Sequence, residues 1–255
     1  LPVTCGTVEE GTILCAGNII PSDFSSSCLH LYQGTDCGKT WSFLSEIVSG
    51  GHAVVDPREP DANRPVWEPF LTVTPDGKLI CFYSDERRAA GSGYNQLLAH
   101  KVSPDGGRTW GEEKIDVAFP GGRLRPGMPV VAALPQGRFI MVYEMVNQDK
   151  IPVYFRISDS IEDWGDRDFI GNPVCAADGS YLTGTPYVSW IPQGGGFFVK
   201  LDSLVDIDNT CGFAGYSQCI LPLHGGKQVL NLCPRQISGE LALIEAAVAD
   251  VYVKA

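Results

Sequence analysis

Two glutamates stand beside aromatic residues at the ends of apolar, strand-like runs. Glu68 follows Trp67 at the start of one run, and Glu144 follows Tyr143 at the end of another. Two carboxyl groups that face one cavity can share acid–base and nucleophilic work, because one can hold a proton while the other accepts one or attacks. The alternative for each is a strand-end side chain in solvent or paired with an arginine, and the residues alone leave both interpretations open.

Five further side chains could bind a ligand beside these glutamates. An arginine can hold a carboxylate or a ring oxygen through two parallel hydrogen bonds. An aspartate can accept bonds from hydroxyl groups, and an aromatic ring can stack on a flat face. Each candidate is equally compatible with a structural ion pair or a packing role. The candidates are Arg64, Trp67, Asp85, Arg125 and Tyr187.

The elements that must position these residues recur along the chain. Ser103–Trp110 and Gly34–Trp41 share the pattern (S/G)-x-D-x-G-x-T-W, and Asp159 and Trp164 stand in the matching places of a degenerate third copy. The copies recur at intervals of about 60 residues, roughly one four-stranded propeller blade with a loop. We expect the aspartates to bond the backbone of their own turns and the tryptophans to be structural.

Pairs of apolar runs around a glycine turn precede these aspartate turns. The turn glycines are Gly11, Gly77, Gly137 and Gly194. Each unit therefore reads strand, turn, strand, loop, strand, aspartate turn, strand. After residue 200 the period fails, and Leu241–Ala249 fits either a helix or a closing strand pair. A ring of blades is usually closed by pairing the two termini in one blade, and Val251–Val253 is the candidate for this pairing.

The repeats predict an all-β fold, a β-propeller with five blades or six with atrophied blades. We expect one domain over 1–255. A β-sandwich is the alternative, although sandwiches do not repeat at this interval. The predicted repeat units are approximately 1–62, 63–122, 123–178, 179–210 and 211–255.

Composition limits the partners and the compartment. The formal net charge of −11 gives no reason to expect nucleic acid or an anionic membrane as a partner. No apolar run is long enough to span a bilayer. The sequence starts without a signal peptide and has no glycosylation acceptor, so an intracellular location stays open.

The nine cysteines are an odd number, so at least one lacks a partner within the chain. Cys15 and Cys81 lie in apolar runs, where we expect buried thiols, and Cys211 and Cys219 could form a disulfide. There is no Cys-x-x-Cys pair, and the four histidines are scattered. We therefore expect no zinc site, no other metal and no cofactor.

The aspartate turns resemble the Asp-boxes of the sialidase-like propeller superfamily. Five further segments in this order resemble glycoside hydrolase family 93, which comprises exo-α-1,5-L-arabinanases on a six-bladed propeller. The resemblance spans about residues 9–200, and the members of the family are longer than this chain. The five segments are Arg64–Leu71, Tyr83–Arg87, Arg125–Val130, Tyr143–Glu144 and Thr183–Val188.

The resemblance implies a retaining glycosidase that cuts arabinobiose from the ends of arabinan. Glu68 and Glu144 occupy the positions that match its two catalytic glutamates, which should lie about 5 Å apart. It also implies a carbohydrate ligand and a secreted protein, and we expect a monomer. Two other functions stay open: a propeller that binds a sugar or small ligand without cutting it, and a non-hydrolytic acid–base enzyme on a small metabolite, favoured if the cysteines are reduced.

Overall fold

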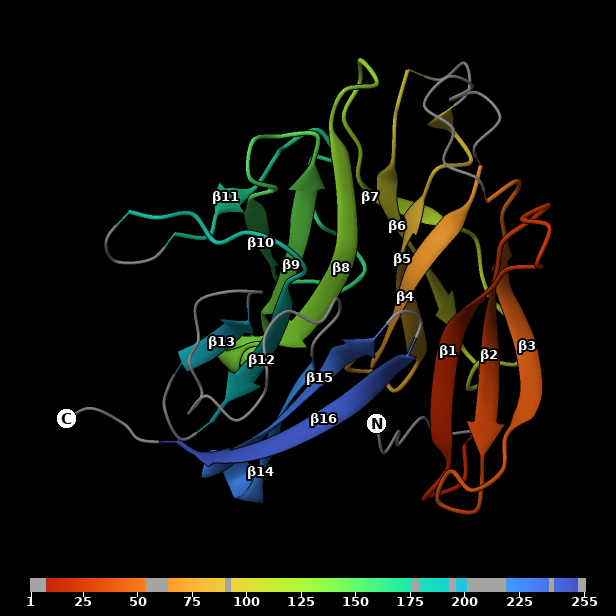
Figure 1. Ribbon diagram of the computed structural model, residues 1–255, viewed down its shortest axis with the longest axis vertical. Helices are drawn as coiled ribbons and strands as arrows, with labels where there is room; N and C mark the ends of the chain where they lie inside the picture. Colours follow the sequence, from red (N-terminus) through yellow and green to blue (C-terminus); the bar gives the residue numbers. More distant parts are fainter. Residues whose placement is uncertain are drawn as a thin grey trace. The chain divides into compact units, whose positions relative to one another are not determined.

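The computed structural model describes residues 8–53, 64–89, 93–175, 179–192, 196–200, 219–238 and 241–251. Antiparallel strands form most of its regular structure, which confirms the all-β prediction (Figure 1). The chain forms two compact units. One comprises Leu1–Pro129 with Ile161–Ile170, and the other comprises Val130–Ser160 with Gly171–Ala255.

The first unit contains two antiparallel sheets whose strands follow chain order (Figure 1). The three-stranded sheet consists of β1 (Ile13–Ile19), β2 (Cys28–Gly34) and β3 (Ser42–Ser49). The four-stranded sheet consists of β4 (Val66–Val73), β5 (Leu79–Asp85), β6 (Leu97–Ser103) and β7 (Lys114–Val117).

One face of each of these sheets packs into a shared core. Leu29 and Leu31 project from β2, and Leu79, Cys81 and Tyr83 project from β5; all five are fully buried in one cluster. They occupy alternate positions because successive side chains of a strand point to opposite faces. Burying a large apolar side chain contributes about 1.5–3 kcal/mol, so this cluster fixes both strands.

The aspartate turns are built as predicted. The Asp105 carboxylate accepts bonds from the Thr109 N–H at 2.8 Å and from its hydroxyl at 2.6 Å. Asp36 accepts the same two bonds from Thr40, at 2.9 and 2.7 Å. These hydrogen bonds lower the pKa of Asp105 to about 2, with that from the Thr109 side chain the largest cause.

The tryptophans of the three copies are not equivalent. Trp110 donates to the Ser45 hydroxyl at 3.0 Å and packs against the core. Trp164 is buried with its ring edge-on to Phe82. Trp41 is 45% exposed and lies over Gly38, so its structural role is confined to its own turn.

The second unit is also built from antiparallel sheets (Figure 1). Its four-stranded sheet consists of β8 (Arg125–Ala133), which begins in the first unit, β9 (Phe139–Val146), β10 (Val153–Ser158) and β11 (Asn172–Pro173). A two-stranded sheet follows, β12 (Tyr187–Ile191) and β13 (Gly196–Lys200). The last sheet consists of β14 (Cys219–Leu223), β15 (Gln228–Ser238) and β16 (Leu241–Asp250).

The final segment is a strand. β16 pairs antiparallel with β15 along its length, so the helical alternative for Leu241–Ala249 is wrong. The backbone N–H of Val251 donates to the Lys227 carbonyl at 2.8 Å. The rest of the predicted closing segment, 252–253, lies outside the described residues.

Seven cysteines fall in the described ranges. Six of them carry free thiols: Cys15, Cys28, Cys37, Cys81, Cys175 and Cys219. Cys81 is fully buried, as predicted, but Cys15 is exposed, so that prediction was wrong. In β1 it is the adjacent Leu14 that faces the core, and strand alternation therefore turns Cys15 outward. Cys211, the suggested disulfide partner of Cys219, lies outside the described residues.

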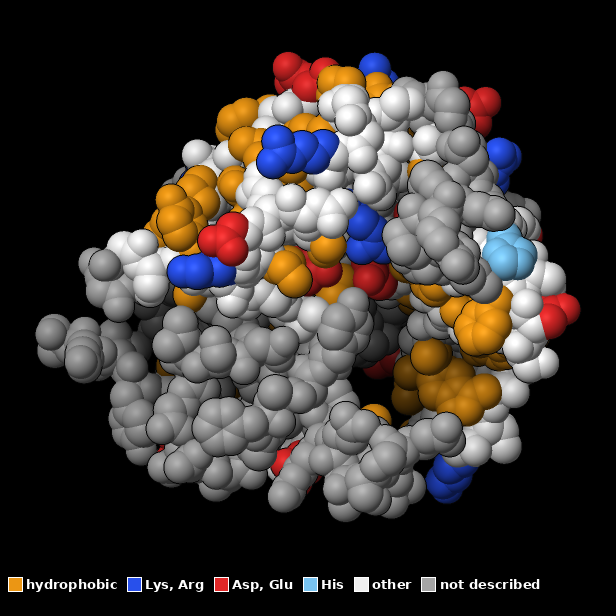
Figure 2. Space-filling model, turned by 45° about the horizontal axis from the view of Figure 1, so that its top comes forward, with side chains coloured by type: hydrophobic (Ala, Val, Ile, Leu, Met, Phe, Trp, Pro, Cys, Tyr) orange, Lys and Arg blue, Asp and Glu red, His pale blue; other side chains and the backbone are white. Residues whose placement is uncertain are grey.

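Charged side chains of both signs are interspersed with uncharged ones on the face shown in Figure 2. Across the described ranges, we find no helix with the length and apolar character needed to cross a membrane.

Candidate active site

Glu68 lies at an irregularity of its strand. The register between β4 and β5 shifts between Trp67 and Phe70, and Glu68 has a left-handed φ of 60°. Pro69 follows and has no N–H for the ladder, which favours a bulge here. Bulges occur next to active sites because they re-aim a side chain. A non-glycine residue in this conformation costs about 1–3 kcal/mol and persists only where its surroundings hold it.

Asn18 of β1 holds the bulge in place. Its side-chain N–H donates to the Val66 carbonyl at 2.7 Å, and its side-chain oxygen accepts the Glu68 backbone N–H at 3.0 Å. One amide side chain therefore satisfies two backbone groups of β4.

The Glu68 carboxylate is oriented by two donors from other strands. Its Oε2 accepts the Ser84 hydroxyl at 2.7 Å and the Met128 backbone N–H at 2.8 Å. Met128 also has a left-handed φ, of 54°. Two backbone positions in sparsely populated conformations thus meet at one carboxylate, a clustering typical of functional sites.

Glu86 links two of the predicted ligand-binding residues and is one that sequence reasoning missed. The buried Glu86 accepts the Trp67 indole N–H at 3.1 Å and an Arg125 guanidinium N–H at 2.6 Å. Trp67, Glu68 and Arg125 therefore lie in one connected cluster with Ser84, Glu86 and Met128. Glu86 stood within the Tyr83–Arg87 segment, but nothing in its spacing distinguished it from Asp85.

Asp85 is bound within a separate ion-pair group. Its buried carboxylate accepts both the Nε and Nη2 donors of Arg87 at 2.9 Å, and Arg87 also pairs with Glu113. Arg88 pairs with the same Glu113 at 2.7 Å. The structure thus gives Asp85 a role in positioning Arg87, while its predicted role as a ligand for hydroxyl groups stays a prediction.

Arg64 lies at the start of the segment that carries Glu68. Its side chain is exposed. Its backbone N–H donates to the His52 carbonyl at 3.1 Å, and its carbonyl accepts the Gly51 N–H at 2.6 Å. The backbone of Arg64 is therefore fixed beside the entry to β4.

Glu144 and Tyr187 belong to the second unit. Glu144 is 6% exposed and stands opposite Val153 in the β9–β10 register. The preceding Tyr143 is fully buried, and burial raises its pKa to about 12. Tyr187 packs against a small apolar cluster that includes Ile191, and burial raises its pKa as well. Glu144 is thus a carboxyl group kept largely out of water, whereas glutamates are mostly exposed.

A recess of about 590 Å³ lies elsewhere in the first unit. Its lining includes Lys114, Glu162 and Arg167. None of the predicted site residues lines it. The recess is therefore separate from the cluster around Glu68 and is no evidence for or against an active site there.

Solved structures resemble this chain over nearly its whole length. The α-L-arabinanase of Penicillium chrysogenum, solved with arabinobiose, is 32% identical with a TM-score of 0.81, and the match covers 98% of this chain and 74% of that one. The family 93 glycoside hydrolase of Fusarium graminearum, an α-L-arabinofuranosidase solved with arabinobiose, is 28% identical with a TM-score of 0.82, covering 98% and 75%.

More distant matches share the fold alone. A microbial sialidase, Hz136, is 16% identical with a TM-score of 0.56. No protein-family model and no curated protein sequence matches this chain.

Proposed function

This chain belongs to glycoside hydrolase family 93, and we propose from that membership that it releases arabinobiose from the ends of arabinan. The membership makes the chain a glycosidase with a β-propeller fold. The Penicillium chrysogenum and Fusarium graminearum structures were both solved with arabinobiose, which supports that sugar as the product. One observation supports an active site at Glu68 most directly. The Ser84 hydroxyl and the Met128 N–H both donate to Oε2 of Glu68 and so fix its carboxylate.

We propose a retaining mechanism in which Glu68 and Glu144 act together. One glutamic acid gives its proton to the leaving glycosidic oxygen while the other carboxylate attacks the anomeric carbon, so that the bond to the leaving sugar breaks as a glycosyl–enzyme ester forms. The first residue then takes a proton from water, whose oxygen attacks the anomeric carbon and releases the second carboxylate. Two inversions at this carbon retain its configuration.

The neighbours of Glu68 fit sugar binding in this scheme. Trp67 offers an aromatic face whose tilt is fixed by its bond to Glu86, and Arg125 is held by the same carboxylate. A ring held in one orientation loses little freedom when a sugar stacks on it. We propose that Trp67, Arg125 and Tyr187 bind the sugar, with Arg64 and Asp85 as further candidates.

The first test replaces each proposed carboxylate separately. Glu68→Gln and Glu144→Gln should each lower arabinobiose release from linear arabinan by at least about 10²–10⁴-fold, the usual contribution of acid–base groups. Glu112→Gln, at an exposed position, is the matched control and should keep wild-type turnover. Undiminished turnover in either active-site variant would remove that residue from the mechanism. Oligosaccharide binding by wild-type protein without any release would support the non-catalytic propeller instead.

A second test addresses the retaining mechanism and the role of each glutamate. Azide is added to Glu68→Ala and Glu144→Ala with an activated arabinoside. Azide rescue of the variant lacking the nucleophile gives a glycosyl azide of inverted configuration, whereas rescue of the variant lacking the acid–base group gives retained configuration. Inverted products from both variants, or neither rescued, would contradict the proposed division of roles.

Six cysteines in the part of the chain that the structure describes carry free thiols, and they favour a second candidate function, because reduced cysteines are typical of intracellular proteins. In that case the paired glutamates would transfer protons on a small metabolite. We propose secretion, from the family membership. Fractionation of a native culture separates the two, since the glycosidase should be recovered with the medium and the metabolite enzyme with the cells.

A further inference from the structure

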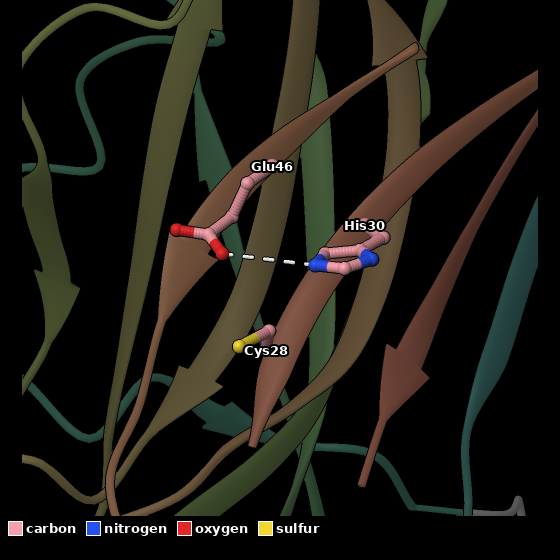
Figure 3. Close-up of side chains that lie close together, drawn as sticks. All are labelled: Cys28, His30 and Glu46. Carbon is pink, nitrogen blue, oxygen red and sulfur yellow. Dashed lines mark ion pairs between the residues drawn. The ribbon is translucent and has the colours of Figure 1, made fainter. Parts of the chain in front are cut away.

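Three side chains of different chemistry meet on the outer face of the β1–β3 sheet. Cys28 and His30 are two residues apart on β2 and alternate with the buried Leu29 and Leu31, so they point away from the core. Glu46 of β3 stands directly opposite His30 in the strand register. Figure 3 shows the three side chains together on this side of the sheet.

Their donor atoms are close enough to share one ion. One ligand atom from each residue lies within 4.8 Å of the other two. The His30 Nε2 and the Glu46 Oε2 are 3.6 Å apart (Figure 3). That separation is too long for a hydrogen bond. It matches two ligands on a tetrahedral zinc ion, which bond lengths of about 2.0–2.3 Å place roughly 3.3–3.6 Å apart.

Neighbouring side chains hold two of these ligands in place. The Ser49 hydroxyl donates to Oε1 of Glu46, which leaves Oε2 directed at the histidine. The Phe43 ring meets the His30 imidazole edge-on, with 5.0 Å between ring centroids. Supports of this kind orient metal ligands and raise affinity.

We propose that Cys28, His30 and Glu46 bind a zinc ion on the β1–β3 sheet. Thiolate, imidazole and carboxylate together suit Zn²⁺ rather than calcium or magnesium, which prefer oxygen ligands alone. Three protein ligands leave a fourth position for water. The sequence did not predict this site, because Cys-x-His is not a common zinc spacing and the third ligand comes from the next strand. The zinc proposal stands independently of the arabinan-cleaving activity.

Metal content tests the proposal directly. Chelator-treated full-length protein is dialysed against Zn²⁺ and its zinc is measured per chain, and Co²⁺ is titrated separately as a coloured substitute. We expect one bound zinc and a thiolate-to-cobalt charge-transfer band in the near ultraviolet. Cys28→Ser should abolish the band, and Cys28→Ser, His30→Asn and Glu46→Gln should each weaken zinc binding by about tenfold or more.

Cys37→Ser is the matched control, because Cys37 is an exposed free thiol outside the cluster. It should keep both the zinc and the cobalt band. Circular dichroism checks that each variant folds, and Glu46→Gln changes an exposed side chain. Zinc content that is equal in wild type, Cys28→Ser and Glu46→Gln, or a cobalt spectrum without a thiolate band, would overturn the proposal.

Discussion

The backbone N–H of Met128 donates to Oε2 of Glu68 at 2.8 Å, and both residues have left-handed φ angles. Neither residue is a glycine or an asparagine, which adopt this conformation at low cost. The strain is therefore stored where a proposed catalytic carboxylate is aimed. The bonds of Asn18 to the bulge provide part of the compensation.

Removal of the Asn18 side chain should loosen that bulge. Asn18→Ala loses two hydrogen bonds, so we expect the free energy of unfolding to fall by about 1–2 kcal/mol. Misplacement of a catalytic group by about 1 Å can cost 10²-fold in rate, so kcat on arabinan should fall by about 10–100-fold. Steady-state kinetics and urea unfolding measure both effects.

Asn95→Ala is the control for the loss of an asparagine side-chain amide. The Asn95 Nδ2 donates a solvent-exposed hydrogen bond to the Gly122 carbonyl at 3.3 Å. It should change neither kcat nor stability appreciably. A kcat for Asn18→Ala that equals the Asn95→Ala value would show that Asn18 does not position Glu68.

Glu86 should affect binding of the sugar more than bond cleavage. Glu86→Gln keeps an acceptor for the Trp67 indole but removes the negative charge that pairs with Arg125. A charge-assisted bond contributes about 1.5–3 kcal/mol, so KM should rise by about tenfold or more while kcat changes little. Glu162→Gln, whose pair with Lys114 spans 3.7 Å, is the control. An unchanged KM in Glu86→Gln would contradict the positioning role.

Local turn chemistry made much of the strand order predictable. Thr74-Pro-Asp-Gly77 forms the expected turn, with the Gly77 N–H donating to the Thr74 carbonyl at 2.9 Å and Gly77 at φ 82°. Such signals are short-range, since proline and glycine restrict the backbone of their own turn. The number of blades and the five repeat boundaries depend on how sheets assemble, and they stay predictions.

The site was only partly predictable, because its contacts join residues that lie far apart in the sequence. Glu68 was found through its aromatic context and the family resemblance, but Ser84, Met128 and Asn18 reach it across 16, 60 and 50 residues. Those contacts depend on strand register and on a bulge, neither of which a single sequence specifies. The predicted burial of Cys15 was wrong for a simpler reason: an apolar run does not reveal which face of the strand is buried.

Gly107 of the second aspartate turn should not tolerate a side chain. It has φ 94°, and a Cβ there would overlap the Leu31 side chain. Gly107→Ala should lower the free energy of unfolding by about 2–3 kcal/mol or more, through both backbone strain and overpacking.

Gly121 separates these two causes, since it has the same φ of 94° and open space around its Cβ position. Gly121→Ala should cost about 1–2 kcal/mol, from backbone strain alone. Equal losses in the two variants, measured by guanidinium unfolding, would mean that Gly107 is not packed against Leu31.

Asp105 should make stability depend on pH in acid. Hydrogen bonds from the Thr109 side chain and neighbouring groups lower its pKa to about 2, whereas an unfolded aspartate titrates near about 3.9. A lowered folded pKa means that the charged form stabilises the fold above about pH 4, and that this contribution is lost as pH falls towards 2. Wild type should therefore exceed Asp105→Asn in stability at pH 6, and the gap should narrow between pH 4 and pH 2. Other carboxylates titrate equally in both proteins and cancel in the difference. Urea unfolding of the pair at several pH values measures the gap, and a gap that stays constant down to pH 2.5 would show that the Asp105 charge does not hold this turn.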